Sequence, residues 1–362
     1  MTGFTPPPYP YERLDEIIKI ASEQDGGAVD LSIGTPCDSA PSTVIEALAS
    51  DDAARGYPPS IGTLALRTAA ADWIERRLGA RVDPVSEVAA VVGSKEFVAS
   101  TPQYLKLRDP SRDTVLYPAI SYPTYAMGAT LAGCRAVPYR TLDEIDPADA
   151  ARALCVWVNS PGNPTGELLD LAAAAEWGRE RDVPVLSDEC YAEFTWTGEP
   201  TTILRGGTRG VIAVHSLSKR DNFAGARIGF FAGDPDLVHY LREVRKHAGL
   251  MPPGPVQAAA TIALGADEHV EAQRTRYLRR MKRLQHVLAA CGYDVELPAG
   301  AFYLWAQAPD GDAWAAARDL ARRAGIVVSP GEFYGPDSSG WFRVAAVQPD
   351  DRIELAASRV GA

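Results

Sequence analysis

The feature of the sequence that most constrains the fold is a series of short, continuously apolar runs separated by stretches with helical spacing. Six such runs occupy the middle of the chain, at residues 88–92, 114–117, 154–158, 183–186, 211–215 and 227–232. Runs that are apolar throughout are typical of strands buried on both faces of a parallel sheet. Only eleven residues separate the last two runs, too few for a helical crossover, so we expect one antiparallel strand. The pattern predicts a large three-layer α/β/α domain with a mixed, mainly parallel sheet.

The last third of the chain has a different pattern, which predicts a second, smaller α+β domain. Apolar residues keep helical spacing from Glu268 to Cys291, and Gly292 is a natural stop for that helix. Beyond it we expect strands at 301–307, 326–329 and 341–347, with a helix at 313–324. The segment LSIGT, residues 31–35, is expected to pack on this domain. The predicted limits are 38–270 for the large domain, and 1–37 with 271–362 for the small domain and its N-terminal arm.

Charge and composition exclude several classes of function. The chain has 36 Lys and Arg against 47 Asp and Glu, a formal net charge of −11, which makes it a poor general binder of nucleic acids or anionic membranes. Its five cysteines and five histidines form no CxxC, HExxH or mixed cluster, so we expect free thiols and no metal site. No apolar run approaches the ~18 residues that span a bilayer, and the N-terminal segment lacks the features of a signal peptide. We therefore expect a cytoplasmic protein.

Glycines and polar residues gather where the predicted parallel strands end, the edge at which α/β proteins bind ligands. Gly93, Ser94 and Lys95 follow the first run and open a helix whose free N–H groups suit a phosphate, although a plain strand-to-helix turn explains the same residues. Asn159 and Asn163 follow the third run in a segment rich in Pro and Gly. Turn formation explains the Pro and Gly residues but not both asparagines.

Two charged residues follow the fourth and fifth runs. Asp188 comes at the end of a buried strand, where a carboxylate predicts a nearby cation, although helix capping is an equally good explanation. Lys219 lies just past a core strand beside Ser216 and Ser218, where desolvation prepares an amine as a nucleophile. Together the loops supply an amine for a Schiff base, an acid for a ring nitrogen and a helix N-terminus for a phosphate. Those are the requirements of pyridoxal 5'-phosphate.

Three stretches carry a resemblance to a known family: NSPGNPTG (159–166), SDECY (187–191) and SLSKRDNFAGARIGF (216–230). They are similar to those of the class I/II, fold-type I, pyridoxal-phosphate-dependent aminotransferases, and the similarity runs from LSIGT to WFRVAAV. The resemblance implies that Lys219 attaches the cofactor and moves protons at the substrate's α-carbon. It implies that Asp188 keeps the ring nitrogen protonated and that Tyr191, with Asn163, holds the ring's 3'-oxygen.

The same resemblance implies further binding residues. Those for the phosphate or the ring are Gly93, Ser94, Lys95, Tyr122, Ser216, Ser218 and Arg227, with Tyr57 reaching the other subunit's site in a homodimer. Arg343 would bind the substrate's α-carboxylate, since a guanidinium matches a carboxylate in a bidentate pair. Gly34 and Asn159 would close that pocket, and no metal is implied.

Several stretches are more closely similar to the actinobacterial N-succinyldiaminopimelate aminotransferases of lysine biosynthesis, among them VDLSIGTPCD, SYPTYAMGA, VRKHAGLMPPGPVQAA and SPGEFYGP. This resemblance implies two-stage, ping-pong transfer of an amino group from L-glutamate to N-succinyl-2-amino-6-oxopimelate. The distal carboxylates of that acceptor need cations or donors. The candidates near the implied site are Arg220, Arg245, Lys246 and His247.

Three alternatives stay open. An aminotransferase for aromatic, aspartate or unsuccinylated diaminopimelate substrates would share every residue named above. A pyridoxal-phosphate-dependent C–S β-lyase would release pyruvate and ammonia without an acceptor, and a non-enzymatic regulator would not need the Lys219–Asp188 pair. A nicotinamide dehydrogenase is set aside, because no GxGxxG opens a helix after the first strand.

Overall fold

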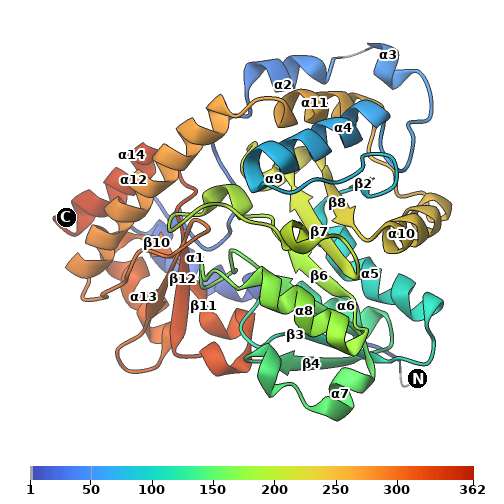
Figure 1. Cartoon of the computed structure of the whole chain (residues 1–362). Helices are drawn as coiled ribbons and strands as arrows, with labels where there is room; N and C mark the ends of the chain where they lie inside the picture. The colour runs from blue at the N-terminus through green and yellow to red at the C-terminus, as the bar shows by residue number, and fades with distance from the viewer. Residues whose placement is uncertain (1–2, 50) are drawn as a thin grey trace. The chain divides into compact units, whose positions relative to one another are not determined.

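A seven-stranded mixed sheet is the centre of the larger of two compact units, Asp38–Thr275 with Ala299–Ala301. The computed structural model describes residues 3–49 and 51–362. The strand order is β2-β8-β7-β6-β5-β3-β4 (Figure 1). The strands are β2 (Val88–Val91), β3 (Thr114–Pro118), β4 (Arg135–Tyr139), β5 (Ala153–Asn159), β6 (Val185–Asp188), β7 (Val211–Ser216) and β8 (Gly229–Gly233). Among the described strands of this sheet only β8 runs antiparallel to its neighbours, as the short connection predicts.

Helices cover both faces of the sheet, which confirms the predicted three-layer α/β/α architecture. Alternate strand residues face opposite sides: Cys155 and Trp157 pack with α5, α6 and α10, whereas Val156 and Val158 pack with α4, α8 and α11. All seven residues of β5 are buried, which explains its unbroken apolar sequence. The helices of this unit are α2 (Ser42–Ala47), α3 (Asp51–Ala54), α4 (Leu64–Trp73), α5 (Ser94–Arg108), α6 (Thr124–Leu131), α7 (Pro147–Ala151), α8 (Leu171–Arg181), α9 (Leu217–Arg220), α10 (Pro235–His247) and α11 (Gly254–Leu264).

The smaller unit comprises residues 3–37, Arg276–Pro298 and Phe302–Ala362. Its antiparallel sheet has the order β11-β12-β9, and β1 pairs in parallel with β10. Leu31 N–H donates to the carbonyl of Val327 (2.9 Å), so the LSIGT segment does join this unit. The elements are α1 (Asp15–Ser22), β1 (Val29–Asp30), β9 (Tyr303–Gln307), α13 (Ala313–Ala324), β10 (Ile326–Val327), β11 (Ser329–Pro330), β12 (Trp341–Ala345) and α14 (Asp350–Arg359). Helix α12 (Glu268–Ala290) contributes residues to both units. The domain limits of 38–270 and of 1–37 with 271–362 remain a prediction from the sequence.

Aspartate side chains fix where several helices begin. Asp170 accepts a hydrogen bond from the N–H of Ala173 (2.9 Å) at the start of α8, and Asp312 does the same for the first turn of α13. Such caps satisfy backbone donors that have no partner within the helix. Within the described ranges, no helix is long and apolar enough to cross a bilayer.

Candidate active site

Helix α5 begins shortly after β2, and its first backbone N–H groups have no side-chain cap in the part of the chain that the structure describes. Gly93 stands at its N-cap with φ +96°, and no side chain among the described residues caps the helix there. A Cβ on Gly93 would lie 2.3 Å from Arg227 Nη2, so the Arg227 guanidinium rests against this glycine. Arg227 Nη1 also donates to the carbonyl of Ala224 (2.9 Å). The first N–H groups of the helix and this guanidinium together form a cradle for an anion.

The asparagines after β5 hold the loop together. Asn159 Nδ2 donates to the carbonyls of Asp188 (2.8 Å) and Pro161 (3.1 Å), and its Oδ1 accepts from the N–H of Asn163 (2.8 Å). Both ends of this buried amide are therefore used within the loop. Turn formation did not explain why an asparagine stands at position 159. Its hydrogen bonds do, because they tie the loop to the end of β6.

Asp188 is a buried carboxylate at the end of β6. The Tyr125 hydroxyl donates to its Oδ2 (2.9 Å) and the N–H of Cys190 to its Oδ1 (3.2 Å). Burial raises the pKa of Asp188, while these hydrogen bonds and the positive charge of Lys219 oppose that rise. The sequence did not indicate Tyr125, because this contact joins positions 63 residues apart.

Lys219 lies in α9, the short helix that follows β7. Ser216 is the N-cap of this helix, and its Oγ accepts from the N–H of Ser218 (3.2 Å). β6 and β7 are neighbouring parallel strands, so Asp188 at the end of β6 and Lys219 just after β7 lie at the same edge of the sheet.

Aromatic side chains surround this edge of the sheet. Tyr191 is buried and Tyr122 is half-buried. Tyr122 meets the ring of Tyr125 edge-on, with 6.0 Å between centroids, and Tyr125 in turn stacks on Trp157 at 5.3 Å. Tyr125 is therefore fixed both by its ring and by its hydroxyl.

In the smaller unit, Arg343 on β12 is only 2% exposed. Its Nη2 donates to the carbonyl of Ser32 (2.6 Å) and to the Tyr11 hydroxyl (3.3 Å), and its guanidinium carbon lies 4.1 Å from the ring centroid of Tyr303. A Cβ on Gly34 would lie 2.2 Å from the Tyr303 hydroxyl, so only glycine allows this approach. The structure thus brings Gly34 and Arg343 together around Tyr303.

Tyr11 is a neighbour of Arg343 that sequence reasoning missed. Burial would raise the pKa of Tyr11, but the Arg343 charge and hydrogen bonds with Tyr334, Ser329 and Arg343 outweigh it, and the pKa is lowered. No sequence signal marks Tyr11, since it stands 332 residues from Arg343.

Two of the arginines expected to read a distal carboxylate are already paired. Arg220 is 4% exposed and contacts Glu193, Asp221 and Asp267, and Arg245 is 2% exposed and pairs with Glu96. Both arginines already have acidic partners, and a role in reading the substrate stays a prediction. Lys246 pairs with Glu243 on the surface (3.2 Å).

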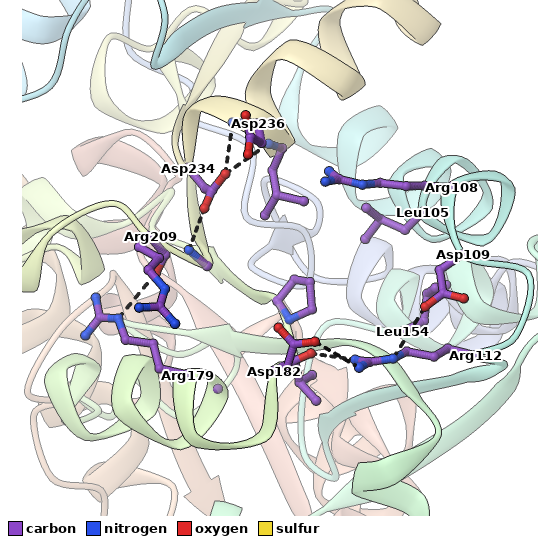
Figure 2. Close-up of a pocket in the computed structure, with 15 residues that line it drawn as sticks. Leu105, Arg108, Asp109, Arg112, Leu154, Arg179, Asp182, Arg209, Asp234 and Asp236 are labelled. Carbon is purple, nitrogen blue, oxygen red and sulfur yellow. Dashed lines mark hydrogen bonds and ion pairs between the residues drawn. The ribbon is translucent and has the colours of Figure 1, made fainter.

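Tyr57 is 98% exposed. A cavity of about 280 Å³ is remote from the predicted site residues at the strand ends, since residues at the starts of β5, β6 and β7 line it (Figure 2). Arg112 pairs with Asp109 (3.5 Å) and Asp182 (3.3 Å) in its lining, and no predicted site residue lines it. No group of His, Cys, Asp and Glu among the described residues could hold a metal ion.

The donor set of the larger unit fits pyridoxal 5'-phosphate. An uncapped helix N-terminus beside a guanidinium suits the phosphate, and a buried carboxylate suits a protonated ring nitrogen. A lysine close to that carboxylate suits the aldehyde.

Comparison with known proteins gives the same answer. Residues 27–360 match the family model described as aminotransferase class I and II. The 4-dedimethylamino-4-oxo-anhydrotetracycline transaminase OxyQ of Streptomyces rimosus is 42% identical over 98% of this chain and 99% of its own. The LL-diaminopimelate aminotransferase of Aquifex aeolicus is 34% identical over 98% and 96%. The structure titled probable N-succinyldiaminopimelate aminotransferase from Thermus thermophilus superposes with a TM-score of 0.85 at 29% identity, covering 97% of this chain and 98% of that one. The chain belongs to the class I and II aminotransferases, enzymes that depend on pyridoxal phosphate.

Proposed function

We propose that this aminotransferase moves the amino group of L-glutamate to N-succinyl-2-amino-6-oxopimelate, in two half-reactions at one site. The sequence stretches similar to N-succinyldiaminopimelate aminotransferases support this acceptor, and relatives named for diaminopimelate substrates support its carbon skeleton. The observation that supports the reaction itself is that Asp188 ends β6 and Lys219 follows β7 at the same edge of the sheet.

The family resemblance supports the following proposed roles for the cofactor-binding residues. When bound, pyridoxal phosphate supplies a protonated ring that draws electrons from the substrate's α-carbon. Lys219 Nζ attaches the cofactor and then moves a proton at the α-carbon, and Asp188 holds the proton on the ring nitrogen. Asn163 and Tyr191 hold the 3'-oxygen, and Tyr122 packs on the ring. The phosphate is bound by the α5 N-terminus at Gly93, Ser94 and Lys95, with Ser216, Ser218 and Arg227.

For the substrate, we propose that Arg343 binds the α-carboxylate that every amino donor and keto acceptor carries. Gly34 allows the close approach of Tyr303, whose ring packs against the Arg343 guanidinium. Asn159 acts on substrate through the loop that it holds, because both ends of its amide are already hydrogen bonded.

The assembly that we propose is a homodimer with shared sites, in the cytoplasm. Tyr57 supports it, because a tyrosine that is 98% exposed in one chain is available for contact with a second chain. Apolar side chains on the neighbouring helices are also exposed: Ile45 on α2 (48%), Leu64 on α4 (56%) and Ile262 on α11 (47%).

A second acceptor is also tested, 4-dedimethylamino-4-oxo-anhydrotetracycline, because the relative at 42% identity is named for it. The test is the absorption spectrum of the purified enzyme, first with L-glutamate and then with each keto compound after glutamate is removed. Glutamate should bleach the yellow form, and the true acceptor should restore it. Bleaching that only the tetracycline compound reverses would reject the succinylated acceptor. A β-lyase would instead release pyruvate and ammonia, without any acceptor, from an amino acid that carries a thiol leaving group on its β-carbon, such as L-cystathionine.

A further inference from the structure

Glu189 is a buried glutamate that the proposed reaction does not use. It follows Asp188 directly but is 1% exposed, and its carboxyl group lies among Ser187, Thr202 and His215. Its Oε1 accepts hydrogen bonds from the Ser187 hydroxyl (2.9 Å) and from the N–H of Ile203 (2.8 Å). Two consecutive acids therefore lie in different surroundings.

The other oxygen of Glu189 faces a histidine. Oε2 stands 3.5 Å from Nε2 of His215, and within residues 3–49 and 51–362 neither of these two atoms makes a hydrogen bond. The His215 ring is 3% exposed and lies between Trp73 and Phe230, with ring centroids 4.9 and 5.1 Å away. A charged imidazolium in this apolar slot would be costly.

Among the described residues around Glu189, no cation is left to hold it as an anion. Arg220 lines the same small cavity, but its guanidinium is paired with Glu193 (3.2 Å), Asp221 and Asp267. The remaining titratable neighbours, Asp188 and Cys190, bring no positive charge. Burial raises the pKa of Glu189 to about 7 and lowers the pKa of His215 to about 3.

We propose that Glu189 is a neutral carboxylic acid that donates its proton to Nε2 of a neutral His215, and that this pair is a positioning device behind the cofactor site. A small rotation closes the 3.5 Å separation to an O–H···N hydrogen bond. The bond ties the end of β6, with Asp188, to the end of β7, which leads into Lys219. Because Glu189 is neutral, Asp188 is left as the one anion of the two consecutive acids. The positioning role rests on the proposed function, whereas the protonation of Glu189 does not.

Glu193 provides a matched control four positions along the chain. It is also buried, at 3% exposed, but it accepts from Trp73 Nε1 (2.7 Å) and pairs with Arg220 and with Arg77 (2.9 Å). Its environment is that of an anion. Glutamine is a neutral replacement of the same shape, so it should mimic Glu189 and fail to mimic Glu193.

The first experiment compares thermal unfolding of cofactor-free wild type, Glu189→Gln and Glu193→Gln between pH 5 and pH 8. The folded-state pKa of Glu189 is raised, so its contribution is fully present below about pH 4.5 and is lost as the pH rises through about 7. We expect Glu189→Gln to be at least as stable as wild type at pH 8, while Glu193→Gln is less stable across the range. A Glu189→Gln protein as unstable at pH 8 as Glu193→Gln would overturn the proposal.

Two further measurements separate protonation from position. Wild-type protein at neutral pH should show the infrared C=O band of a buried carboxylic acid, and Glu189→Gln should lack it; a wild type without the band would overturn the proposal.

Pyridoxal phosphate should bind Glu189→Gln with wild-type affinity, whereas Glu189→Ala should bind it at least about tenfold more weakly. Equal affinity in wild type and Glu189→Ala would overturn the positioning role. A wild type that does not bind pyridoxal phosphate would contradict the proposed function instead, and the infrared band of the cofactor-free protein would still report on Glu189.

Discussion

A buried carboxylate such as Asp188 is stable as an anion only when hydrogen bonds and a cation replace the water that it loses. Tyr125 and the Cys190 N–H supply the hydrogen bonds, and Lys219 is the neighbouring cation in the chain. A bound ring that carries a proton on its nitrogen would add a second cation. The site is thus arranged so that binding the cofactor relieves the cost of burying Asp188.

Replacing Asp188 by asparagine removes this charge without changing the size of the side chain. We expect the rate of the glutamate half-reaction to fall about 100- to 1000-fold, since a positioned charge of this kind is lost. Rapid mixing with L-glutamate measures this rate. Tyr125→Phe is the control, because it removes one hydrogen bond to Asp188 but keeps the carboxylate and the stacking on Trp157. A rate for Asp188→Asn equal to that of wild type would refute the proposed role.

Arg343 offers a second prediction at this scale. Arg343→Ala should lower kcat/KM about 100-fold for L-glutamate and for every keto acid alike, because all share the α-carboxylate. Steady-state kinetics with several substrate pairs checks this. A loss restricted to one acceptor would place Arg343 at the distal end of the substrate. Arg352, which donates to the carbonyls of Gly26 and Ala28 and contacts no predicted site residue, is the matched control.

At the scale of elements, the sequence predicted the buried strands of the seven-stranded sheet and missed its exposed edge strand, β4. All seven residues of β5 are buried, so its apolar run is unmistakable. The edge strand β4 has mostly exposed residues and therefore no such run. The loops at the strand ends were predicted together with the strands, because each loop directly follows an apolar run. The pairing of Arg220 with Glu193 and of Arg245 with Glu96 could not be, because ion pairs between distant residues leave no local pattern.

The start of α5 gives a prediction for a whole element. Gly93→Ala places a side chain at φ +96° and pushes against the Arg227 guanidinium, so the anion cradle must change shape. We expect pyridoxal phosphate to bind at least about tenfold more weakly while the chain stays folded, since this strain costs on the order of 1–3 kcal/mol. Equilibrium dialysis measures the affinity. Gly225→Ala is the control from the loop beside Arg227, because no described atom lies within 4 Å of its Cβ. Unchanged affinity in Gly93→Ala would argue against phosphate binding at this helix.

At the scale of the whole molecule, the proposed homodimer makes a prediction that no single chain could satisfy. In a mixed dimer of Lys219→Ala and Tyr57→Ala subunits, one of the two sites has both native residues. Random exchange of the subunits should therefore restore about a quarter of the sites, although each variant alone is impaired. Activity measured after unfolding and refolding the mixture tests this. Mixing that restores no activity would indicate that each site is built from one chain.

The full exposure of Tyr57 in a single chain also affects how the enzyme behaves on dilution. On the proposed arrangement, the phosphate contact of Tyr57 exists only while two subunits are associated, so cofactor affinity is linked to protein concentration by mass action. A concentrated stock would hold its pyridoxal phosphate, whereas the same enzyme diluted below the dissociation constant of the dimer would lose it. Specific activity would then depend on how much enzyme is in the cuvette.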